Sequence, residues 1–133
     1  MSAWAHGPFD NDDALDFIED LAEAPGWRTI TQALDHVSKT AGYLEAPEGQ
    51  IAVAAAAIVA AAVGEATILP DNHRELKAAL GAPPEGSVAL ARSALARVVA
   101  PASELDELWQ EGDGHDAWLT QIAALQSTLS KAQ

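Results

Sequence analysis

The sequence predicts an all-α fold, a single compact domain of six to seven helices around one buried, alanine-rich central helix. No run of residues alternates between apolar and polar over the length of a strand. Proline and glycine recur at intervals that suit short links between helices. The apolar content is mostly alanine, and 5% of the residues are aromatic, which favours closely packed helices over sheet. The 133 residues fit one domain, 1–133, with an N-terminal arm over 1–9.

The first helix is predicted over 11–23. Asp10 precedes it as the expected N-cap, and Phe9 can pack onto the first turn. Apolar residues at helical spacing form a stripe that would face the core: Ala14, Phe17, Ile18 and Leu21.

The central helix is predicted over 48–63, where the sequence becomes apolar on every side before it ends at Gly64. The apolar run 51–64 is fourteen residues long, and a membrane-spanning helix needs roughly twenty. We therefore expect a buried core helix. Its alanines would let neighbouring helices approach closely, because they leave little side-chain volume between the backbones.

The remaining helices are predicted from apolar residues at helical spacing between breaks made by proline, glycine and serine. Their predicted ranges are 27–41, 72–80, 87–99, 104–111 and 114–131. Ser103 is the expected N-cap of the helix at 104–111. Three tryptophans, Trp27, Trp109 and Trp118, are expected to close the core from its ends, and Trp4 to hold the N-terminal arm against the domain.

The net charge of −13 lies mainly at the two ends of the chain. Residues 1–27 contain seven acidic and no basic residues, and residues 104–133 contain six acidic residues and one lysine. Such a distribution disfavours nucleic acids and anionic membranes as partners, because both require clustered Lys and Arg. The chain has no cysteine for a disulfide or a thiolate metal site, and its start shows no signal-peptide pattern. We therefore expect a cytoplasmic protein.

The segment GPFDNDDALDFIEDL, 7–21, concentrates six carboxylates within eleven residues. Like-charge pairs at helical spacing cost about 0.2–0.5 kcal/mol each, a deficit that a domain stable by about 5–15 kcal/mol can tolerate. The segment can therefore be a solvated helix face. It can also bind a basic protein partner, as small acidic inhibitor or immunity proteins do. The candidate partner-binding residues are Asp16, Glu19, Asp20 and Glu23.

A divalent-cation site is the third interpretation of this segment. The pattern DDALD offers Asp12, Asp13 and Asp16 as ligands for Mg²⁺ or Ca²⁺, although the spacing of a calcium-binding EF-hand loop is not met. A small helical pyrophosphohydrolase would need carboxylates on two facing helices. Asp13/Asp16 or Asp16/Glu19 could supply one pair and Glu104/Glu107 the other. The four histidines show no zinc-binding spacing, and no nucleophile or phosphate-loop motif is present.

The N-terminal segment combines a tryptophan with a Gly-x-Phe-Asp-Asn-Asp-x-Ala sequence and an acidic helix. The residues of this combination are Trp4, Gly7, Phe9, Asp10, Asn11, Asp12, Ala14, Asp16 and Leu21. In these residues, in its alanine-rich central helix and in its length, the chain resembles a bacterial family, domain of unknown function 4259. The resemblance implies a helical cytoplasmic protein of bacterial origin and supplies no activity.

Two departures from the family pattern are visible. Ala5 follows Trp4 where the family has glycine, and the run 51–63 is wholly apolar where an acidic residue often interrupts it. The recurring unit Phe9-Asp10-Asn11-Asp12 suits the capping and docking of the first helix beneath the Trp4 arm, because Asp and Asn side chains readily bind nearby backbone amides. We expect this structural role for the unit and not metal ligation.

From these observations we expect a non-enzymatic interaction protein that binds a basic protein partner and needs no cofactor. The alternative is a magnesium-dependent phosphate or nucleotide pyrophosphate hydrolase that uses the acidic first helix. The oligomeric state and the identity of the partner do not follow from the sequence.

Overall fold

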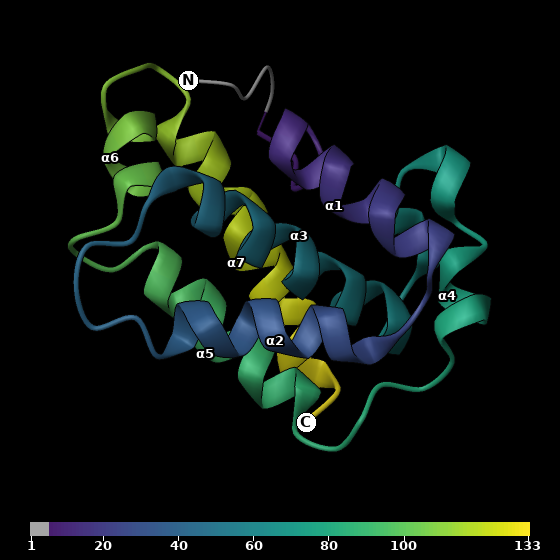
Figure 1. The fold of residues 1–133 in the computed structure, drawn as a ribbon. Helices are drawn as coiled ribbons and strands as arrows, with labels where there is room; N and C mark the ends of the chain where they lie inside the picture. Colours follow the sequence, from purple (N-terminus) through teal and green to yellow (C-terminus); the bar gives the residue numbers. More distant parts are fainter. Residues whose placement is uncertain (1–5) are drawn as a thin grey trace.

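The structure is a computed structural model that describes residues 6–133 (Figure 1). These residues form seven α-helices and two short 3-10 helices, and they contain no strand. The elements are α1 (Asp12–Glu23), α2 (Trp27–Ser38), α3 (Ala46–Val63), η1 (Ala66–Ile68), η2 (Asp71–His73), α4 (Leu76–Leu80), α5 (Ser87–Val98), α6 (Glu104–Gln110) and α7 (His115–Lys131). The predicted all-α fold is confirmed. Residues 1–5, including Trp4, lie outside the described part of the chain.

Helix α3 runs through the middle of the molecule, and the other long helices surround it (Figure 1). Every residue from Ala52 to Ala61 is buried. By length and composition α3 could cross a membrane, with a mean hydropathy of 1.6 over its 18 residues, but 67% of that window is buried inside the fold. Burial of the apolar surface against other helices therefore places α3 as the core helix of this domain.

The neighbouring helices bring larger side chains to the alanine surface of α3. The fully buried ones include Ile18 on α1, Ile30 and Leu34 on α2, Leu95 on α5 and Leu129 on α7. The expected apolar stripe of α1 is buried at Ala14, Ile18 and Leu21. Phe17 is half-buried and packs at the edge of the core.

Arg97 on α5 joins the α2–α3 connection to the α5–α6 connection. Its guanidinium donates to the carbonyl oxygens of Thr40 (2.9 Å), Gly42 (2.6 Å) and Ala102 (3.3 Å). Leu44 N–H donates to Ala102 O at 2.8 Å in an isolated parallel bridge between the two segments. Helix α2 ends at Ser38, three residues before the predicted residue 41, and Arg97 donates to two carbonyls of the segment that follows it, Thr40 and Gly42.

The predicted helix over 72–80 is interrupted. Residues Asp71–His73 form η2, and α4 begins only at Leu76. Trp27 on α2 donates from Nε1 to Leu80 O at 3.0 Å, which holds the end of α4 against the start of α2. Trp109 and Trp118 are buried at the other end, where their rings stack with centroids 6.0 Å apart.

We expect Ala56→Leu to destabilise the fold by about 1–3 kcal/mol, because three extra carbons must enter a fully packed core. Ala56 is 0% exposed, and the helix propensities of Ala and Leu are close, so the loss measures packing. Thermal melting would report a fall of several degrees in Tm.

Ala62→Leu is the matched control for this substitution. Ala62 lies on the same helix, but it is half-exposed and lines a surface cleft. Its variant should melt close to the wild type. Equal losses of stability at the two positions would contradict the role assigned to the buried alanines.

Candidate functional site

The segment before α1 closes on itself through Gly7 and Asp10. Gly7 N–H donates to Asp10 Oδ2 at 3.0 Å, and Asp10 N–H donates to Gly7 O at 3.2 Å. A Cβ atom at position 7 would collide with Asp10 Oδ2, so a larger residue there would displace the Asp10 side chain from its hydrogen bond. Phe9 is buried within the turn, 8% exposed, and belongs to the core.

Asn11, and not Asp10, is the N-cap of α1. Its Oδ1 accepts from Ala14 N–H at 2.8 Å, while its Nδ2 donates to Gln50 Oε1 at 3.0 Å on α3. Both side chains are buried. The prediction of Asp10 was wrong because its carboxylate accepts from Gly7 N–H in the preceding turn, while Asn11 is the residue that reaches both Ala14 N–H and Gln50. The Asn11 amide supplies both the acceptor for Ala14 N–H and the donor for Gln50.

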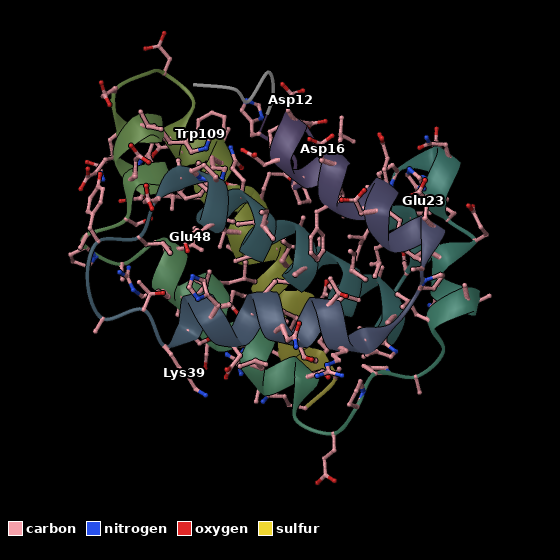
Figure 2. All side chains as sticks on the ribbon, viewed as in Figure 1. Asp12, Asp16, Glu23, Lys39, Glu48 and Trp109 are labelled. Atoms are coloured by element: carbon pink, nitrogen blue, oxygen red, sulfur yellow. The ribbon has the colours of Figure 1, made fainter. Side chains whose placement is uncertain are left out.

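The acidic residues of α1 lie mainly on its solvent side, and Figure 2 marks Asp12, Asp16 and Glu23 along the helix. The exposed residues are Asp12, Asp16, Glu19, Asp20 and Glu23, and Asp13 is half-buried. Within residues 6–133, none of these six carboxylates takes part in a salt bridge or accepts a hydrogen bond. We call the exposed set Asp16, Glu19, Asp20 and Glu23 the α1 acidic face.

The acidic residues of α6 are used inside the molecule. Glu104 Oε1 accepts from Ala46 N–H at 2.7 Å, at the start of α3. Glu107 Oε1 accepts from the Tyr43 hydroxyl at 2.7 Å. Asp106 Oδ1 lies 2.8 Å from Nε2 of His115 on α7. These carboxylates therefore join α6 to its neighbours, a use that the sequence pattern did not indicate.

The carboxylates considered for a metal do not gather around one point. Across residues 6–133, the structure contains no group of three or more His, Asp or Glu side chains that could hold a metal ion. Asp12, Asp13 and Asp16 stand on one helix, and Glu104 and Glu107 make the contacts described above. The two carboxylate pairs of the hydrolase alternative are thus not brought together.

Tyr43 is the single tyrosine of the chain and is 52% exposed beside α6. Its hydrogen bond to the Glu107 carboxylate raises the pKa of Tyr43 to about 12, and the negative charges of Glu104 and Glu111 act in the same direction. Removing the phenol proton would break this hydrogen bond and place a negative charge beside the carboxylates.

We expect Asn11→Ala to lower the free energy of unfolding by about 2–4 kcal/mol, because it removes the helix cap and leaves Gln50 Oε1 buried without a donor. Denaturant unfolding measures the loss. Asp10→Ala, which removes only the half-buried contact to Gly7, should cost about 0.5–1.5 kcal/mol. Adding Gln50→Leu to Asn11→Ala should recover stability, because no unpaired polar group remains. A loss at Asn11 no larger than that at Asp10 would contradict this account.

The near-ultraviolet absorbance of tyrosinate should show Tyr43 ionising around pH 12, above its ordinary value of about 10. The stability contributed by its hydrogen bond is present below pH 10 and is lost as the pH rises through the folded-state value. Glu107→Gln should move the midpoint toward 10. Glu85→Gln removes the same charge from an exposed site outside this group and should leave the midpoint in place, with circular dichroism confirming folding.

The comparison with known families identifies the chain. No curated protein and no solved structure matches it. The model of the family described as Domain of unknown function (DUF4259) matches residues 2–121, a range that contains the N-terminal turn, α1 and the central helix. The chain therefore belongs to the DUF4259 family, as its N-terminal motif predicted.

Proposed function

We propose that the protein binds a cationic protein partner through the α1 acidic face and acts without a cofactor, as an inhibitor or immunity protein does. The observation that supports this proposal is the contrast between the carboxylates of α6 and the α1 acidic face. Glu104, Asp106 and Glu107 of α6 contact partners within the fold, whereas the α1 acidic face is exposed and has no partner among residues 6–133. Following the family resemblance, we place the protein in the bacterial cytoplasm.

The spacing of the α1 acidic face gives the proposal its physical basis. Asp16 and Asp20 are four residues apart, as are Glu19 and Glu23, so each pair shares one side of the helix and repels. A cationic surface that binds here would be attracted to all four carboxylates and would offset the repulsion between them. The field of four neighbouring carboxylates would also steer a basic partner and raise its association rate, more strongly at low salt.

A peptide display library offered to the immobilised protein tests the proposal, in about 0.15 M salt to suppress weak contacts. The selected peptides should be rich in Lys and Arg. Their affinity should fall by about fivefold or more when the face is neutralised by Asp16→Asn, Glu19→Gln, Asp20→Asn and Glu23→Gln, because four exposed ion pairs contribute about 1–4 kcal/mol.

The matched control neutralises four exposed acidic residues elsewhere: Glu85→Gln, Glu111→Gln, Asp113→Asn and Asp116→Asn. This control variant loses the same net charge as the α1 variant, and it should bind the peptides with the affinity of the wild type. The α1 variant should melt no lower than the wild type, since it loses only like-charge repulsion. Selected peptides without a cationic bias, or equal binding by the two variants, would overturn the proposal.

A further inference from the structure

An apolar cleft lies beside the start of α1, between the N-terminal turn and the connection from α3 to α4. Its volume is about 390 Å³. The apolar side chains that line it are Pro8, Phe9, Leu15, Ile68, Leu69 and Pro70. Phe9 and Leu69 are buried and form its floor, whereas Leu15 and Ile68 are half-buried and keep part of their surface open. A volume of this size falls within the range of sites that hold small ligands or single side chains.

The cleft continues toward α7. Two adjoining clefts of about 260 and 440 Å³ also include Ile68, and Pro8 is shared with the smaller of them. Ile68 thus lies where these clefts meet, between the N-terminal turn, η1 and α7. The two adjoining clefts have mixed linings, with Thr128 and Lys131 in the larger and Leu125 and Gln121 in the smaller. The apolar contact for a bound side chain therefore comes mainly from the first cleft.

The rim of the cleft is acidic. Asp10 lines it directly. Leu15 stands on α1 between Asp12, three residues before it, and Glu19, four residues after it, and both carboxylates are exposed. Residues at these spacings are surface neighbours on a helix. An apolar site flanked by carboxylates favours an apolar side chain that has Lys or Arg as neighbours in its own segment. It disfavours the same side chain in an acidic segment, because the carboxylates repel that segment.

We propose that this cleft receives a large apolar side chain from the same Lys- and Arg-rich protein segment that the α1 acidic face binds. The inference rests on the proposed function and names the chemistry of the partner more closely. Protein interfaces take most of their affinity from a few side chains buried in pockets, which a polar rim surrounds. The carboxylates attract the basic segment and orient it across α1. The cleft buries its apolar side chain, a contact whose strength does not fall as the salt concentration rises.

Two synthetic peptides of about twelve residues test the inference, because a segment of that length reaches from the cleft across α1. They carry the same Lys and Arg residues and differ only at the central position, which is Phe in one and Ala in the other. Fluorescence anisotropy of the labelled peptides gives the affinities. We expect the wild type to bind the Phe peptide about tenfold or more tightly, the gain from burying one large apolar side chain.

Ile68→Gln should abolish the preference for the Phe peptide, because it places an amide at the centre of the apolar lining without changing the charge. Val88→Gln is the matched control, a half-buried apolar residue on α5 outside the cleft, and it should keep the preference. Thermal melting of both variants separates an effect on the cleft from an effect on folding.

The outcomes separate this inference from the proposed function. Equal affinity of the wild type for the two peptides overturns the role of the cleft, and the acidic face stands if its neutralised variant loses both peptides. A Phe preference that survives Ile68→Gln also overturns the cleft. A preference that needs Ile68 but is unaffected by neutralising the α1 acidic face supports the cleft and overturns the proposed use of the carboxylates. Failure of both peptides to bind overturns both proposals.

Discussion

The close packing of neighbouring helices against the alanine surface of α3 is the constraint on which the rest of the structure depends. Ten consecutive residues of α3, Ala52–Ala61, are buried, and seven of them are alanine. Alanine itself removes little apolar area from water, so most of the hydrophobic stabilisation comes from the larger side chains that the neighbours lay on this surface. Ile18, Leu34 and Leu95 are examples, each fully buried on a different helix. A packed interior leaves no space for larger residues on α3.

One buried polar contact fixes how α1 lies on this surface. Asn11 caps α1 and binds Gln50 at the start of α3, so the first turn of α1 has one position relative to the core. Because a helix is rigid, the side that faces the core at its first turn also faces the core further along. In α1 this side carries Ala14 and Ile18, which are buried. The acidic residues then face solvent on the opposite side. The orientation of the α1 acidic face follows from burial of the apolar stripe Ala14, Ile18 and Leu21, and the Asn11 cap and its hydrogen bond to Gln50 hold the start of the helix in place.

The sequence predicts the parts of this structure that depend on local periodicity, and it misses those that depend on distant contacts. The all-α fold, the buried central helix and the stripe of α1 follow from apolar spacing alone. Asn11, the N-cap in place of Asp10, contacts Gln50 on α3, and the segment that follows α2 contacts Arg97 on α5. Neither partner is visible in the local pattern. The acidic segment of α1 is likewise visible in the sequence, but the cleft around Ile68 is not, because three segments of the chain must meet to form it.

Net charge counts the two acidic ends of the chain as similar, but within residues 6–133 three of the six carboxylates at the C-terminal end have partners and none of the six on α1 does. On α6 each of Glu104, Asp106 and Glu107 has a partner in the fold, so each of these charges has a structural role within the domain. On the α1 acidic face the carboxylates repel one another and have no salt-bridge or hydrogen-bond partner within residues 6–133. A group of charges that weakens the isolated domain becomes favourable once a cationic surface approaches it. The apolar cleft beside them adds what charges alone lack, because burial of an apolar side chain is insensitive to screening by salt. Together, the two features would make the proposed binding surface more specific than either would be alone.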